Sequence, residues 1–427
     1  MITLLTITFI LGYALIAFEH VIKVNKSATA LLTGTLCWSI YILFSPDKQL
    51  INTQLAEHLG SLSGILFFLL GAMTIVELID SHNGFEIITS KIRQTDKRIL
   101  LWIIGIITFF LSAILDNLTT TIVIVSLLRK LIKNPQDRLF FTGIVVIAAN
   151  AGGAWTPIGD VTTTMLWIGG QISTGNIMMK LFLPSFICLA VPLIFLSFKL
   201  KGAIERPENG KNKDKPELST RHQTIIFVSG LLMLILVPVF KTFTHLPPYL
   251  GMLGGLGILW VITEVIHGKK DEADKHTLSV VHALRKIDTS SILFFFGILI
   301  SIAALESSGI LIELANWMTK TVDNINIVVL SLGILSAVVD NVPLVAAAQG
   351  MYDLSQYPMD HYFWEFLAYA VGTGGSVLII GSAAGVAAMG MEKINFFWYL
   401  KKISLLALLG YFAGAITYIV QHQMLGL

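Results

Sequence analysis

Two six-residue stretches decide how this chain folds: residues 112–117 read Ser-Ala-Ile-Leu-Asp-Asn, and residues 336–341 read Ser-Ala-Val-Val-Asp-Asn. They lie 224 residues apart, and their identities include every polar position. Each interrupts an apolar run, where an aspartate costs roughly 2.5–3.5 kcal/mol on membrane-insertion scales unless it faces a cavity or a partner. The repeat therefore predicts two equivalent elements that bring polar groups to one internal site.

A glycine-rich break follows each Asp-Asn pair. Residues 151–160 contain Ala-Gly-Gly and Ile-Gly-Asp, and residues 373–382 contain Thr-Gly-Gly and Ile-Gly-Ser, at an offset of 222. Small residues of this kind also serve close helix packing in membranes, which is the alternative reading of the glycines alone. With the Asp-Asn pairs they predict broken helices over 139–167 and 362–390, in the same order in both halves.

The composition is that of a membrane protein. Of the 427 residues 13% are charged and 55% are hydrophobic, and the mean hydropathy is +0.77, whereas a soluble domain carries about 25% charged residues. An ordinary soluble enzyme is excluded, and the formal net charge of +2 gives no surface for nucleic acid. The expected surroundings are a lipid bilayer.

Apolar runs of about 20 residues, the length that a helix needs to cross a bilayer, predict about ten transmembrane helices. They are expected near 2–21, 27–45, 61–80, 139–167, 177–198, 222–241, 249–267, 289–305, 362–390 and 394–420.

Lysine and arginine fix the predicted orientation. Six short intervals hold 25 of the 29 basic residues: 22–26, 81–98, 129–138, 199–221, 268–288 and 391–402. With these intervals in the cytoplasm, as the positive-inside rule requires, the ten spans alternate and both termini lie outside. The stretch near 99–132 must then enter and leave from the cytoplasmic side, and the stretch near 325–352 from outside.

These two stretches are predicted to be opposed re-entrant hairpins, because non-helical backbone at membrane depth is tolerated only where it is buried or lines a cavity. The expected fold is thus an all-α polytopic membrane protein with two inverted repeats, residues 1–198 and 222–427, joined by a cytoplasmic linker over 199–221. Such repeats, with broken helices at the midplane, are typical of secondary transporters.

Oxygen-bearing side chains at the hairpin tips and helix breaks form a candidate site for a small hard cation such as Na⁺. The carboxylates of Asp116, Asp160 and Asp340 are expected near one cavity, where Na⁺ and H⁺ would compete for them. Competition gives antiport if the empty, unprotonated site cannot cross the membrane. The alternative is that these aspartates only cap helix ends. The candidate ligands are Asp116, Asn117, Thr119, Thr120, Asn150, Thr156 and Asp160 in the first half, and Asp340, Asn341, Thr373, Ser376 and Ser382 in the second.

Three further polar residues are candidates for pH sensing or proton relay: Glu19, His20 and Glu77. The favoured alternative places them at the membrane interface, with Glu19-His20 in an ion pair with a lysine. Glu365 is likewise expected to be solvated at the interface.

Residues 116–120, Asp-Asn-Leu-Thr-Thr, and 150–160, Asn-Ala-Gly-Gly-Ala-Trp-Thr-Pro-Ile-Gly-Asp, resemble the NhaD family of sodium/proton antiporters, part of the ion transporter superfamily. The segment from Glu19 to Lys26 is similar to the family's start. The resemblance implies exchange of Na⁺ or Li⁺ for H⁺, with Na⁺ export supporting pH homeostasis. It implies a scaffold and a mobile transport unit in each protomer of a homodimer, and no cofactor beyond the transported ions. The ion site would be Asp116, Asn117, Asp160, Asp340 and Asn341.

Other functions are less well supported. An anion or oxyanion permease of the same superfamily would need basic groups in its cavity, yet only Lys180 and Lys320 lie even at the margins of the predicted spans. A membrane-embedded enzyme is disfavoured because the chain has no H-E-x-x-H and no Gly-x-Ser-x-Gly motif. The absence of an Arg/Ser-rich transit segment favours the cytoplasmic membrane of a bacterium.

Overall fold

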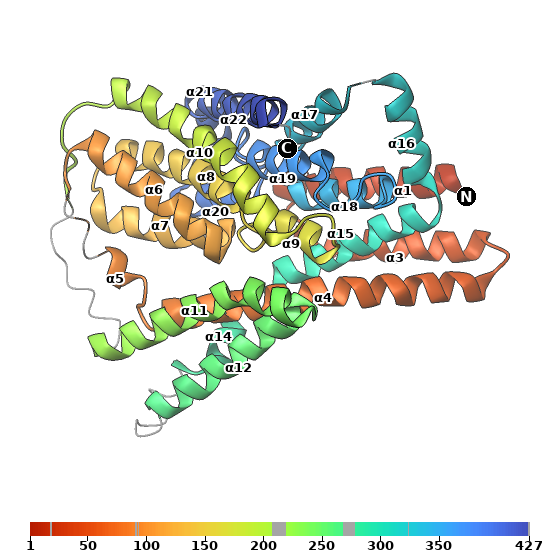
Figure 1. Cartoon of the computed structure of the whole chain (residues 1–427), viewed down its shortest axis with the longest axis horizontal. Helices are drawn as coiled ribbons and strands as arrows, with labels where there is room; N and C mark the ends of the chain where they lie inside the picture. The colour runs from red at the N-terminus through yellow and green to blue at the C-terminus, as the bar shows by residue number, and fades with distance from the viewer. Residues whose placement is uncertain are drawn as a thin grey trace.

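The computed structural model describes residues 1–17, 19–89, 92, 94–206, 219–267, 278–322 and 324–425, which are mainly helical (Figure 1). The helices of the first half are α1 (Ile2–Ala17), α2 (Glu19–Ile22), α3 (Lys26–Phe44), α4 (Lys48–Ser81), α5 (Glu86–Thr89), α6 (Lys97–Leu115), α7 (Asn117–Leu131), α8 (Pro135–Gly153), α9 (Val161–Ile168) and α10 (Thr174–Lys199). Those of the second half are α11 (Thr220–Thr244), α12 (Pro248–His267), α14 (Val280–Lys286), α15 (Thr289–Ser307), α16 (Ile310–Thr321), α17 (Ile325–Leu335), α18 (Asn341–Met351), α19 (Tyr362–Gly374), α20 (Ala383–Glu392), α21 (Phe396–Lys402) and α22 (Ser404–Leu425).

Eight of the described helices are long and apolar enough to cross a membrane: α3, α4, α6, α10, α11, α12, α15 and α22. The chain is therefore a polytopic membrane protein, as predicted. Three of the ten predicted spans are absent from this set. The span expected near 2–21 is the shorter helix α1, of 16 residues. The other two are each broken into a pair of helices, α8 with α9 and α19 with α20. Conversely, α6 belongs to the set although its residues were predicted as one arm of a hairpin, because its 19 residues form one uninterrupted helix.

Both predicted hairpins are pairs of helices that turn back at an aspartate. Asp116 separates α6 from α7, and Asp340 immediately precedes α18. At the base of the first hairpin, Lys97 at the start of α6 forms an ion pair with Asp137 at the start of α8, with Nζ 2.7 Å from Oδ2. Because α7 ends shortly before α8 begins, the first hairpin returns to the side from which it entered.

The two hairpins open in opposite directions. At the base of the first, the Arg98 Nε donates to the carbonyl of Leu200, at the C-terminal end of α10, over 2.8 Å. At the base of the second, Glu365 in the first turn of α19 pairs with Lys180, near the N-terminal end of α10. A helix of 26 residues is about 39 Å long, so the two bases lie near opposite ends of α10.

Equivalent hydrogen bonds in the two halves hold each hairpin against the broken helix of its own half. The Ser112 hydroxyl donates to the carbonyl of Ala149 over 2.6 Å, and the Ser336 hydroxyl donates to that of Val371 over 3.0 Å. A Cβ on Gly374 would collide with the backbone oxygen of a facing hairpin residue, as would one on the equivalent glycine of the first half. The glycines therefore do serve close packing, and that packing positions the hairpin tips beside the helix breaks.

The helices divide into two groups, which meet where α15 packs on α18 (Figure 1). One contains α6 to α10 with α17 to α22, and the other contains α1, α3, α4, α11, α12, α14 and α15. Within the first group, α7 packs on α20, and α18 packs on α9. Each hairpin thus contacts the broken helix of the other half, so the two halves share one central region.

Candidate ion-binding site

The carboxylate of Asp160 lies at the centre of this region and is 1% exposed. Its Oδ1 accepts hydrogen bonds from the backbone N–H of Thr162 at 2.9 Å and from the Thr162 hydroxyl at 2.8 Å. Its Oδ2 accepts from the Asn117 Nδ2 at 2.5 Å, and the Asn341 Nδ2 reaches Oδ1 at 3.5 Å. The asparagines of both hairpin tips therefore converge on one buried carboxylate.

Asn150 extends this network into the second half. Its Oδ1 accepts from the Asn117 Nδ2 at 3.0 Å, and its Nδ2 lies 2.9 Å from the hydroxyl oxygens of both Ser376 and Ser382. Ser382 caps the N-terminus of α20 as Asp160 caps that of α9, at an offset of 222. The two halves thus place a hydroxyl and a carboxylate at equivalent positions of one shared site.

All three predicted aspartates cap helices, so the capping role weighed from the sequence is confirmed. Asp116 accepts the N–H of Thr119 at 2.8 Å with one oxygen and the Thr119 hydroxyl at 2.7 Å with the other. Asp340 accepts the N–H of Val342 at 3.2 Å. Asp116 also has a φ of 109°, a conformation that costs a non-glycine residue about 1–3 kcal/mol.

Lys26 is a charged partner that the sequence analysis did not identify. Its Nζ lies 3.7 Å from Oδ2 of Asp340. One sequence signal pointed to Lys26: it directly precedes the apolar run of α3 and ends the segment from Glu19 to Lys26 that resembles the family's start. The fold brings its side chain to a hairpin tip more than 300 residues away along the chain. Thr162 was also missed, although the residue two positions after an N-cap aspartate commonly donates its backbone N–H to the cap.

The remaining predicted hydroxyls fall into two kinds. Thr156 donates to the carbonyl of Ala113 at 2.6 Å, and Thr373 donates to that of Tyr369 at 2.7 Å, so both fix backbone around the breaks. The Thr120 hydroxyl oxygen is buried and has no hydrogen-bond partner among the described residues. It is the hydroxyl of this set whose hydrogen-bonding capacity is unused by the described residues.

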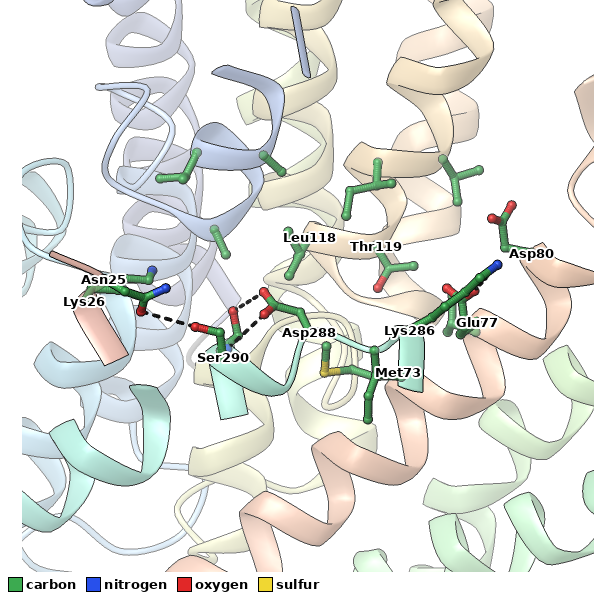
Figure 2. Close-up of a pocket in the computed structure, with 18 of the residues that line it drawn as sticks. Asn25, Lys26, Met73, Glu77, Asp80, Leu118, Thr119, Lys286, Asp288 and Ser290 are labelled. Carbon is green, nitrogen blue, oxygen red and sulfur yellow. Dashed lines mark hydrogen bonds and ion pairs between the residues drawn. The ribbon is translucent and has the colours of Figure 1, made fainter. Parts of the chain in front are cut away.

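A cavity of about 480 Å³ leads to the first hairpin tip (Figure 2). Leu118 and Thr119, directly after the tip, form part of its wall. Six charged residues also line it, four acidic and two basic: Glu19, Glu77, Asp80, Asp288, Lys26 and Lys286. Lys286 and Asp288, just before α15, lie on the cavity wall, and the excess of acidic over basic groups in the lining favours cations over anions.

The candidates for sensing or relay have separate surroundings. Glu77 lines the cavity and lies 3.5 Å from the Nζ of Lys286, whereas the Glu19 carboxylate accepts the backbone N–H of Lys26 at 3.2 Å. The prediction of a lysine ion pair for Glu19 is therefore replaced by a backbone hydrogen bond. The side chain of His20 lies outside the described residues.

The prediction that Glu365 is solvated was wrong. Its side chain is fully buried, with one oxygen 3.5 Å from the Nζ of Lys180 and the other accepting from the Tyr418 hydroxyl at 2.6 Å. Asn176 also donates to it. Packing of α10 and α22 over the start of α19 covers the carboxylate, and this tertiary contact leaves no trace in the local sequence.

The chain is similar to known transport proteins. A family model described as citrate transporter, CitMHS, matches residues 13–374. Sodium/proton antiporter 1 of Arabidopsis thaliana is 48% identical over 98% of this chain and 72% of its own length, and sodium/proton antiporter 2 of the same plant is 46% identical over 98% and 99%. The Na⁺/H⁺ antiporter NhaD of Vibrio cholerae is 31% identical over 97% of this chain and 91% of its own.

Proposed function

Because this chain belongs to the NhaD-type sodium/proton antiporters of the CitMHS transporter family, we propose that it exchanges Na⁺ or Li⁺ for H⁺ across a membrane. The observation that carries the proposal is the burial of Asp160 among polar groups supplied by both hairpin tips and both helix breaks. Among the ion pairs of the described residues, none includes Asp160 or Asp116. A buried carboxylate of this kind requires a neutralising partner.

A single cation or proton supplies that partner. Removing an ionised carboxylate from water costs several kcal/mol, and an opposite charge held by further oxygen ligands offsets the cost. Asn117 and Asn341 hold the carboxylate in place, and the Thr120 hydroxyl offers a further oxygen nearby on α7. Since Na⁺ and H⁺ neutralise the same carboxylates, binding of one displaces the other. An empty and charged site does not cross, so each Na⁺ that leaves on one side is replaced by protons for the return.

The acidic cavity supports a cation as substrate. Both lysines of its lining lie beside carboxylates, Lys26 beside Asp340 and Lys286 beside Glu77. A di- or tricarboxylate such as citrate would enter a space whose lining carries more acidic than basic groups, without a basic group that is not already paired. Electrostatic complementarity therefore favours Na⁺ over an anion.

We place the cavity on the cytoplasmic side and both termini outside, because the positive-inside rule assigns the basic intervals to the cytoplasm and two of them supply Lys26 and Lys286 to the cavity wall. A cytoplasmic membrane, a homodimer, and a transport unit that moves against a scaffold belong to the same proposal. The two helix groups of Figure 1 are the natural candidates for unit and scaffold. Chemical cross-linking in membranes tests the dimer, and labelling of single cysteines near the termini tests the orientation.

The direct test is proton flux in proteoliposomes, with Na⁺, Li⁺, K⁺, succinate and arsenite added separately. Na⁺ or Li⁺ is expected to drive proton movement against an imposed pH gradient, and the anions are expected to have no effect. A response to an anion and not to Na⁺ would refute the proposed substrate while leaving the architecture intact.

A further inference from the structure

The segment between α1 and α3 holds the start of α3 in a fixed position. Asn25 caps α3 by accepting the N–H of Ser27 at 2.8 Å, and the Glu19 carboxylate accepts the N–H of Lys26 at 3.2 Å. The Ser27 hydroxyl donates to the carbonyl of Ser290, in the first turn of α15, at 2.6 Å. Polar contacts from three directions therefore fix the first residue of α3, which is Lys26.

The side chain fixed in this way extends toward the second hairpin. The Lys26 Nζ lies 3.7 Å from Oδ2 of Asp340 and 4.3 Å from the ring centroid of Phe294. The Lys26 side chain is 23% exposed and that of Asp340 is 16% exposed, so water screens the pair only in part. Figure 2 shows Lys26 on the wall of the cavity, at the opposite end from Lys286. An ammonium group therefore occupies an oxygen that the Asp340 cap leaves available.

We infer that Lys26 is a tethered cation that competes with the transported cation for the carboxylate of Asp340. This inference rests on the proposed function and assigns a further residue to the same site. Lys26 belongs to the helix group that contains α3 and α15, whereas Asp340 lies between α17 and α18 of the group that contains both hairpins. Movement of one group against the other would separate the pair.

The consequence concerns how tightly the open site holds its substrate. While the cavity is open, the ammonium of Lys26 neutralises Asp340 and weakens its attraction for Na⁺. Removal of this competitor should let Asp340 add its charge to the binding of Na⁺. Lys26 acts here through Asp340 and is therefore a positioning residue, not a ligand of the transported ion.

The test is the apparent KM for Na⁺ of the reconstituted exchanger at one pH. In Lys26→Met we expect KM to fall about tenfold, the size of a coupling between charged neighbours. Turnover should fall as well, because a more tightly held cation leaves more slowly. Lys26→Arg keeps the charge and should keep the wild-type KM. In an Asp340→Asn background, Lys26→Met should change KM no further.

Lys97→Met is the matched control. Lys97 is the first residue of α6, as Lys26 is the first residue of α3. The ion pair of Lys97 with Asp137 is buried to a similar extent, with side-chain exposures of 18% and 16%, but it lies at the base of a hairpin and not at its tip. This variant should leave KM for Na⁺ unchanged.

An unchanged or higher KM in folded Lys26→Met protein, or an equal fall of KM in the Asp340→Asn background, overturns the inference. If Lys26→Met does not fold, Lys26→Gln removes the charge and keeps a hydrogen-bond donor for the same comparison. Wild-type protein without Na⁺-driven proton flux would refute the proposed function itself, so the two failures are distinguishable.

Discussion

Asp160→Asn tests the proposed site most sharply, because it changes the charge of the central group and almost none of its shape. The wild-type carboxylate accepts from Thr162 and from the amide of Asn117. An asparagine carbonyl can still accept the two hydrogen bonds from Thr162. Its NH₂ group would then face the Asn117 NH₂, so one hydrogen bond is lost along with the charge.

The magnitude follows from the burial. Asp160 is 1% exposed, so its interaction with a bound cation is screened little by water. Removing one partner of such a desolvated charge pair costs about 2–5 kcal/mol. Since 1.4 kcal/mol is a factor of ten, Na⁺ affinity should fall by roughly 30-fold or more. The loss of folding stability should be smaller, because the neutral side chain no longer requires a neutralising partner.

Two measurements separate these effects. Equilibrium binding of radioactive Na⁺ to purified protein gives the affinity, and thermal unfolding without Na⁺ gives the stability. Asp137→Asn is the control, since it neutralises an aspartate in an ion pair at a hairpin base, away from the site. If Asp160→Asn binds Na⁺ with wild-type affinity, Asp160 is a helix cap and the site has been misplaced.

Three further outcomes are expected. In Gly374→Ala the new methyl group would collide with a facing backbone carbonyl, so the free energy of unfolding should fall by about 1–3 kcal/mol and the melting temperature with it. In the control Gly254→Ala the methyl group meets nothing within 4 Å, so the melting temperature should stay nearly unchanged. Glu392→Gln removes the charge of a carboxylate that is 3% exposed and lies 2.6 Å from the Nε of both Arg129 and Arg138. The melting temperature should therefore fall by the equivalent of about 1–3 kcal/mol. A variant as stable as the wild type would show that these ion pairs contribute nothing to stability. The apparent KM for Na⁺ should rise as pH falls, because protons occupy the competing carboxylates; a KM independent of pH in flux assays would contradict competition.

Much of the central region could be predicted because its polar residues interrupt apolar runs. Asp116 and Asp340 mark the hairpin tips, and the glycine pairs mark the helix breaks, since each is costly inside a membrane unless the fold uses it. The equivalence of Asp160 and Ser382 also followed from the repeat. These inferences need only local cost and internal symmetry.

What the sequence could not supply were contacts made by tertiary packing. Nothing near Asn341 indicates that it approaches the carboxylate of Asp160, and nothing near Lys26 indicates Asp340. Glu365 has the sequence context of an interfacial residue and is buried only because α10 and α22 cover it. Hydropathy records what a residue would cost in lipid, but not which distant helix covers it.

Proton release on Na⁺ binding is the measurement that tests the competition most directly. Na⁺ is added to purified protein in weakly buffered solution near neutral pH, and the change in pH is recorded. Wild-type protein should release protons as Na⁺ binds, and Asp160→Asn should release markedly fewer. Binding of Na⁺ with no proton release in the wild type, under conditions where proteoliposomes exchange the two ions, would contradict a shared carboxylate site.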